Sequence, residues 1–140
     1  MNAHGSPSAE DSAIIEAFFK AGPWAVVGAS RDPEKFGNKV LRAYLDHSYP
    51  ISVVHPREDE IEGVACVRSL EELDPIPKSM SIVTPPSVAL HWVEEASRLG
   101  IERLWFQPGA SSEEALTKAA ELGLDVLANG PCILVEFRKR

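Results

Sequence analysis

The residues best suited to chemistry lie in a glycine-containing turn near the start of the chain, GASRDPEKFG at 28–37. Gly28 allows a tight backbone turn, and Ala29 and Ser30 are small enough for a phosphate group to approach free backbone N–H groups. A helix beginning directly after the turn would add an electrostatic field that favours an anion. The turn therefore predicts a phosphate site, and the alternative is that Gly28 only turns the chain.

Basic side chains accompany this turn. Arg31 and Lys35 lie within it and Lys39 follows it closely, and all three could neutralise further negative charge on a ligand. Arginine suits this task best because its guanidinium binds two phosphate oxygens at once. These three residues are therefore candidates for the same anion site.

Alternating apolar and amphipathic segments predict the elements that must position the turn. Buried strands are predicted at residues 24–28, 51–55, 80–84, 103–107 and 124–128. Helices are predicted at residues 9–21, 36–48, 69–74, 86–100 and 111–123. The final segment, CILVEFRKR at 132–140, is compatible with a sixth strand or with a short closing helix.

Strands that are apolar throughout and separated by helices predict an α/β fold with a parallel sheet. We expect a doubly wound Rossmann-like domain with five strands, or six, and helices on both faces. With the strands numbered along the chain, the expected order is 3-2-1-4-5. A chain of 140 residues with 44% hydrophobic residues fits one domain, at 9–140, after a flexible tail at 1–8.

In an open parallel sheet, ligands bind beyond the carboxyl ends of the strands. Loops rich in Gly, Pro, Ser and basic residues follow all five predicted strands, which favours a binding site over a set of purely structural turns. The candidate binding residues after the later strands are His55, Pro56, Arg57, Thr84, Pro85, Gln107, Pro108 and Gly109.

The end of the second strand bears on the type of nucleotide. An NAD site usually has an acidic residue here to hold the ribose hydroxyls. This chain instead has His55, Pro56 and Arg57, with Glu58 and Asp59 directly after them. A neutral or positive strand end disfavours NAD and suits a ribose that carries a phosphate, as in NADP or coenzyme A.

Several of these segments together resemble a known family. The segments are AVVGASRDPEKFGNKV, VVHP, SIVTPPS, LWFQPGA and the late GPC, and the resemblance covers about residues 13–137. They resemble the small stand-alone CoA-binding proteins, which are similar to the N-terminal CoA-binding domain of the succinyl-CoA synthetase alpha subunit. The resemblance implies that the CoA phosphates lie on Gly28, Ala29, Ser30 and Arg31. It also maps a basic residue to Arg57 and a further loop to Gln107, Pro108 and Gly109.

Two positions depart from that family. The turn of the synthetases is richer in glycine than GASRDP. In their loop after the fourth strand, an acidic residue occupies the position of Pro108. The synthetases also carry a phosphohistidine in a second domain, and this chain ends before such a domain. We therefore expect a binding protein with no catalytic residue and no metal, acting as a carrier, sensor or regulatory module, although the sequence does not decide whether it is an enzyme.

The histidines and cysteines carry open alternatives. His55 is placed to touch an adenine or ribose, or it is a strand-end residue satisfied by local hydrogen bonds. Cys132 is either redox-responsive, facing the thiol of bound CoA, or a small buried hydrophobe. His91 is expected on a helix surface or in packing, and Cys66 in packing.

Charge and hydropathy exclude several partners. The net charge of -7 argues against nucleic acid and anionic membranes, which need a basic surface. No apolar run is long enough to span a bilayer, so a soluble, cytoplasmic protein is expected. A homodimer is plausible if Ile133, Val135 and Phe137 are exposed.

Two other functions compete with CoA binding. An NADP-dependent oxidoreductase, or a degenerate nucleotide-binding fragment of one, would use the same fold and Arg57, but would need a dimer partner to complete a substrate pocket. A pure interaction module would leave the glycine turn empty.

Overall fold

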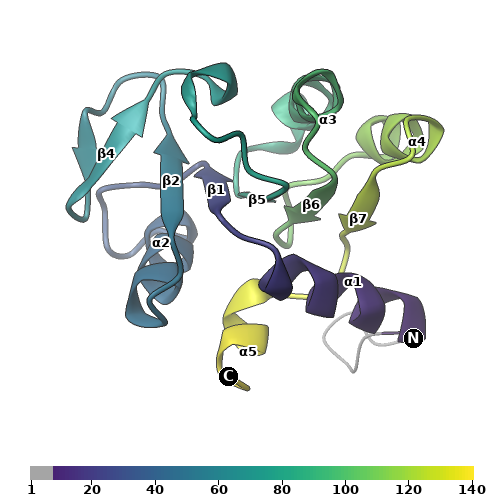
Figure 1. Ribbon diagram of the computed structural model, residues 1–140, viewed down its shortest axis with the longest axis horizontal. Coiled ribbons are helices and arrows are strands. Elements are labelled where there is room, and N and C mark those ends of the chain that lie inside the picture. The colour runs from purple at the N-terminus through teal and green to yellow at the C-terminus, as the bar shows by residue number, and fades with distance from the viewer. Residues whose placement is uncertain (1–7) are drawn as a thin grey trace.

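The strands of the protein pair into one seven-stranded sheet that lies between two layers of helices (Figure 1). The structure is a computed structural model and describes residues 8–140. The strands are β1 Trp24–Val27, β2 Ile51–Val54, β3 Glu60–Ile61, β4 Val64–Val67, β5 Ser79–Ile82, β6 Arg103–Phe106 and β7 Asp125–Leu127. The helices are α1 Ala9–Lys20, α2 Phe36–Asp46, α3 Ala89–Leu99, α4 Glu113–Glu121 and α5 Ile133–Phe137, with 3-10 turns η1 Leu70–Glu72 and η2 Pro86–Val88.

The predicted fold class is confirmed, but the strand count and order differ from the prediction. The sheet order is β3-β4-β2-β1-β5-β6-β7, and every pair is parallel except β3 with β4. The strand predicted at 80–84 was expected beside the strand at 51–55. It is β5, and it pairs with β1 and β6 instead.

The difference comes from a hairpin that the sequence analysis treated as a polar loop. In this hairpin Ile61 pairs with Val64, so that only Glu62 and Gly63 form the turn. Both turn residues have positive φ, 50° and 82°. A two-residue turn of this kind has a backbone twist that fits the right-handed twist of the two strands. Strand β4 then pairs in parallel with β2. It thus occupies the position beside β2 that was predicted for the strand at 80–84.

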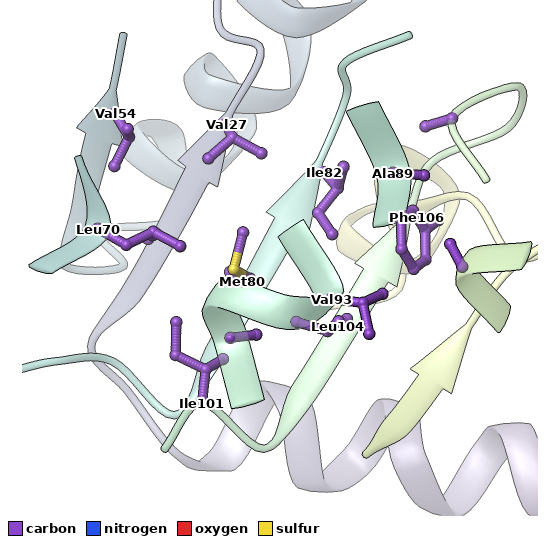
Figure 2. Close-up of a cluster of buried hydrophobic side chains, with 14 of the residues drawn as sticks. Val27, Val54, Leu70, Met80, Ile82, Ala89, Val93, Ile101, Leu104 and Phe106 are labelled. Atoms are coloured by element: carbon purple, nitrogen blue, oxygen red, sulfur yellow. The ribbon is translucent and has the colours of Figure 1, made fainter. Parts of the chain in front are cut away.

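One face of the sheet packs against α3, α4 and η1 (Figure 2). Side chains alternate along each strand, so Val27, Ile82 and Phe106 point to this face. Small helical residues such as Ala89 and Ala96 let the helices approach the sheet closely. Larger side chains of the same helices, such as Trp92 and Leu116, pack at the edges of this cluster.

The opposite face packs against α1, α2 and α5 and is rich in aromatic side chains. Tyr44 of α2 is fully buried, and its hydroxyl lies 2.7 Å from Oγ of Ser81 on β5. Burial raises the pKa of Tyr44 well above its ordinary value, so the phenol stays protonated. The pair satisfies both hydroxyl groups inside the core.

The C-terminal residue contacts the helix α1 on this same face. Ser8 caps α1 by accepting a hydrogen bond from the backbone N–H of Asp11, and the rest of the predicted tail lies outside the described residues. The C-terminal segment forms the helix α5, which decides between the two alternatives. Arg140 pairs with Glu16 at 3.1 Å, and its guanidinium lies 4.0 Å from the centre of the Phe19 ring.

The exposure of α5 bears on the expected homodimer. Ile133 and Phe137 are buried in the core, and Val135 is 43% exposed. Only one of the three apolar side chains is therefore available, and a homodimer stays a prediction. Among residues 8–140, no helix combines the length and apolar character that a bilayer span requires.

Replacing Tyr44 by Phe tests the buried hydroxyl pair. We expect Tyr44→Phe to lower the free energy of unfolding by about 1 kcal/mol, because Ser81 then lacks a partner in the core. The double variant Tyr44→Phe with Ser81→Ala removes both hydroxyls and should recover most of that loss. Urea unfolding measures both values, and a double variant less stable than Tyr44→Phe alone would contradict the pairing.

Candidate functional site

A cavity of about 780 Å³ opens at the carboxyl ends of β1, β2 and β5. This volume is in the range typical of sites for small molecules and cofactors. The predicted binding residues that line it are Gly28, Ala29, Ser30, Lys35, His55, Pro56, Arg57, Thr84 and Pro85. Seven further residues also line it and were not among the predicted ones, namely Val27, Phe36, Gly37, Val54, Arg68, Val83 and Trp92.

Two glycines shape the first wall of the cavity. Gly28 has φ 96°, and a Cβ there would lie 2.6 Å from the carbonyl carbon of Val83. A Cβ on Gly37 would collide with the carbonyl oxygen of Gly28. The start of α2 and the end of β5 therefore approach the turn at backbone distance, which only glycine allows.

The N-terminus of α2 lies beside this turn and has no side-chain cap. Its N-cap residue, Lys35, makes no capping hydrogen bond, and its first turn has no acidic residue. The helices α1 and α4 differ, because Ser8 and Ser112 cap them and acidic residues occupy their first turns. The α2 terminus thus presents its field and first N–H groups to the cavity, which suits an anion.

The loop between the turn and α2 is held by its own side chains. Oγ of Ser30 accepts from the backbone N–H of Asp32 at 3.1 Å, and Oδ1 of Asp32 accepts from the N–H of Glu34 at 2.9 Å. Arg31 forms an exposed ion pair with Glu58, at 3.3 Å, and does not line the cavity. Lys39 is exposed on α2 and also lies outside the lining.

The second wall is the loop after β2, which is organised by His55. Its Nδ1 accepts hydrogen bonds from the backbone N–H groups of Arg57 and Glu58, both at 3.0 Å. The imidazole is therefore neutral, with its proton on Nε2. Burial lowers the pKa of His55. His55 thus makes local hydrogen bonds at the strand end, which was one of its two predicted roles. The other role, a contact to adenine or ribose, stays a prediction.

Arg68, which directly follows β4, braces the same loop. Its Nη1 donates to the carbonyl oxygens of His55 and Glu58, at 3.2 and 2.6 Å, and its Nη2 donates to the carboxylate of Asp59. The sequence analysis missed this residue because it did not recognise β4 as a strand. Once β4 is known, Arg68 stands at a strand end beside β2, where a site residue is expected.

The third wall comes from β5 and α3. Nε1 of Trp92 donates to Oγ1 of Thr84 at 3.0 Å, which fixes the indole over the loop after β5. The tryptophan packs against the core and also lines the cavity. A tryptophan on an amphipathic helix is usually a core residue, and the sequence alone gives no signal that this one also borders a cavity.

The predicted residues after β6 lie elsewhere. Gln107 is 1% exposed, and its Oε1 accepts from the backbone N–H of Ile133 at 3.0 Å, so it joins β6 to α5. Pro108 and Gly109 are exposed and do not line the cavity. Strand β5 separates β6 from β1 in the sheet, which explains why this loop is remote from the first wall.

The two cysteines also lie outside the lining. Cys66 is half-buried against the aromatic face of the core, as expected for packing, and burial raises the pKa of its thiol. Cys132 is half-buried at the N-cap of the short helix α5. His91 is exposed on α3.

The charges of the lining all have the same sign. Lys35, Arg57 and Arg68 are cationic, and the lining, drawn from residues 8–140, includes no carboxylate and no cysteine. Within that part of the chain, neither Lys35 nor Arg57 takes part in an ion pair. Two cations are thus available for an anionic ligand. No group of three or more His, Cys, Asp or Glu side chains in the described residues could hold a metal ion.

A cavity at this edge, bordered by a glycine turn, an uncapped helix and free cations, defines a Rossmann-like nucleotide-binding domain. The family model for the CoA-binding domain matches residues 23–138. The chain therefore belongs to the CoA-binding domain family.

Three related proteins place the chain within this family. It is 32% identical over 103 residues to the Bacillus subtilis protein YneT, described as uncharacterized, with coverage of 74% of this chain and 76% of YneT. It is 29% identical over 93 residues to the alpha subunit of ADP-forming acetate–CoA ligase II from Pyrococcus furiosus. That match covers 64% of this chain and 20% of the subunit, so the chain corresponds to a fifth of that protein's length.

The third is a conserved hypothetical protein of Pyrococcus furiosus whose structure has been solved. It is 42% identical to this chain, with a TM-score of 0.76. The match covers 81% of this chain and 97% of that one. Proteins with nearly the length of this chain thus exist beside the much longer ligases.

The neutral state of His55 predicts a pH dependence of stability. Because the pKa of His55 is lowered from 6.5 in the folded protein, the unfolded chain takes up a proton at higher pH than the folded chain does. The free energy of unfolding should therefore fall as the pH drops below about 6.5. Urea unfolding at several pH values between 7.5 and 5 measures this loss.

His55→Ala serves as the comparison, since it removes this imidazole and leaves the rest of the sequence unchanged. We expect a smaller loss of stability on acidification in this variant than in the original protein. An equal or larger loss would show that His55 does not hold the loop in its neutral form.

Proposed function

We propose that the protein binds coenzyme A, or an acyl-CoA, in this cavity and acts as a non-catalytic carrier, sensor or regulatory module. The observation that carries the proposal is the uncapped start of α2 beside the Gly28 turn, where Lys35 forms no ion pair with any residue in the described part of the chain. Membership of the CoA-binding domain family supports the choice of ligand.

The proposal gives three parts of CoA a position in the cavity, namely the pyrophosphate, the ribose with its 3'-phosphate and the pantetheine arm. The pyrophosphate would lie on the turn from Gly28 to Ser30 and on the first N–H groups of α2. The ribose and its 3'-phosphate would lie at the second wall, where Arg57 is free to bind a phosphate. The less polar pantetheine arm would follow Phe36 and Trp92 on the way out of the cavity.

The lining also supports a binding role without catalysis. General acid–base and covalent catalysis use histidine, lysine, serine or threonine as well as carboxylates and thiols, provided that the group is free to react. In the described lining, Nδ1 of His55 accepts two backbone hydrogen bonds, Oγ of Ser30 accepts one from the N–H of Asp32, and Oγ1 of Thr84 accepts one from Trp92. The three cations of the lining can hold and orient an anionic cofactor.

Ligand-dependent stabilisation tests the proposal. The purified protein is heated alone and with equal concentrations of CoA, dephospho-CoA, NADP or NAD, because a ligand that binds only the folded state raises the melting temperature. We expect the largest rise with CoA and a smaller one with dephospho-CoA. A larger rise with NADP than with CoA would favour the oxidoreductase, and no rise with any ligand at millimolar concentration would favour an interaction module.

Two lysines of the same helix region provide a matched pair of variants. Lys35 lines the cavity and Lys39 does not, although both are exposed. We expect Lys35→Ala to weaken CoA binding about tenfold, the usual effect of losing one charge-assisted hydrogen bond. Lys39→Ala should leave the dissociation constant unchanged. Isothermal titration calorimetry measures both, and equal losses in the two variants would show that only general electrostatic attraction is involved.

A further inference from the structure

The side chain of Asn38 connects the first wall of the cavity to the β3–β4 hairpin. Asn38 is fully buried in the first turns of α2. Its Nδ2 donates to the carbonyl oxygen of Ser30 at 2.8 Å and to Oε2 of Glu62 at 2.9 Å. One amide group thus holds the phosphate-type turn and a segment 24 residues away.

Packing alone does not explain an asparagine at this position. Its Oδ1 is buried and has no hydrogen-bond partner within the described residues. An unsatisfied buried acceptor destabilises the folded state, and an apolar residue of the same size would avoid that loss. The retained amide indicates that its two donated hydrogen bonds serve a purpose other than filling the core.

The backbone of Glu62, the second partner of the Asn38 amide, is also in an unfavourable state. It occupies the hairpin turn with φ 50°, a conformation that favours glycine, asparagine or aspartate. Its side chain is the one that reaches Asn38. The hydrogen bond therefore offsets part of the conformational cost of a glutamate at this turn.

The hairpin continues to the second wall of the cavity. Strand β4 begins directly after the turn and ends at Val67, next to Arg68, which holds the carbonyl oxygens of His55 and Glu58. A continuous series of contacts thus runs from Ser30 through Asn38, Glu62 and β4 to the loop after β2. Asn38 itself does not line the cavity.

We propose that Asn38 is a positioning residue, which keeps the two walls of the cavity at the separation that the nucleotide requires, and that Glu62 is its partner. The proposal rests on CoA binding in this cavity. The loss of Asn38 would then reduce the affinity for the whole nucleotide, with or without the 3'-phosphate, while the folded state itself stays about as stable.

The main variant is Asn38→Leu, which keeps the branched shape of the side chain, although it is larger, and removes both the orphaned acceptor and the two donated hydrogen bonds. We expect the melting temperature without ligand to change little, because lost hydrogen bonds and a removed buried acceptor act in opposite directions. The dissociation constants for CoA and dephospho-CoA should both rise about tenfold. Unchanged affinity in a stable Asn38→Leu protein would overturn the proposal.

The exposed partner residue gives a test that does not risk the fold. Glu62→Ala removes the acceptor, whereas Glu62→Gln keeps an oxygen that can accept from Nδ2 of Asn38. We expect weaker CoA binding in Glu62→Ala and near-normal binding in Glu62→Gln. The combination of Asn38→Leu and Glu62→Ala should bind no more weakly than Asn38→Leu alone, since both act through one linkage. Fully additive losses would contradict the linkage.

Hydrogen exchange separates this proposal from the proposed function. In the ligand-free protein, Asn38→Leu and Glu62→Ala should each speed amide exchange in residues 29–35 and 59–64, while the strands β5 and β6 keep their protection. Faster exchange together with an original protein that binds no CoA would overturn the function and retain the linkage. Unchanged exchange in both segments would overturn the linkage, whatever the original protein binds.

Discussion

The cavity depends on one steric constraint, which is the close approach of three backbone segments around Gly28. Strand β5 passes so near that a side chain at Gly28 would meet the carbonyl group of Val83, and the start of α2 passes so near that a side chain at Gly37 would meet Gly28. This approach directs the helix terminus and its field at the space beyond the strands. A bulkier turn would move α2 away, and the cations would then surround a wider opening.

The electrostatics of the cavity follow from how the neighbouring charges are paired. Arg31 forms an ion pair with Glu58, and Arg68 binds Asp59 and two carbonyl oxygens, so both mainly connect neighbouring loops. Among residues 8–140, Lys35 and Arg57 take part in no ion pair, so their charge is available at the cavity. His55 contributes shape and not charge, because its neutral ring accepts two backbone N–H groups. Structural and ligand-facing cations thus lie side by side, and sequence alone does not separate them.

The sequence predicted what depends on hydrophobic pattern. Five buried strands, their helices and the carboxyl-edge location follow from long apolar or periodic segments. The β3–β4 hairpin was missed because β3 has two residues and its Glu-Gly turn is not a usual hairpin signal. Because the hairpin was missed, the predicted order placed β5 beside β2 in the position of β4. For the same reason, Arg68 was not recognised as a residue at a strand end. Lys39 and the residues from Gln107 to Gly109 were selected by proximity in sequence or by family resemblance, and only the three-dimensional arrangement shows that they lie outside the lining.

The turn residue Glu62 has a consequence for engineering this protein. A redesign that chose residues by local turn preference would place asparagine or glycine there, and the hairpin alone would gain stability. The same change would leave the amide of Asn38 with one acceptor in place of two. A residue that is unfavourable for the local turn can therefore make a contact to a distant segment, and a redesign based on turn preference alone would remove that contact.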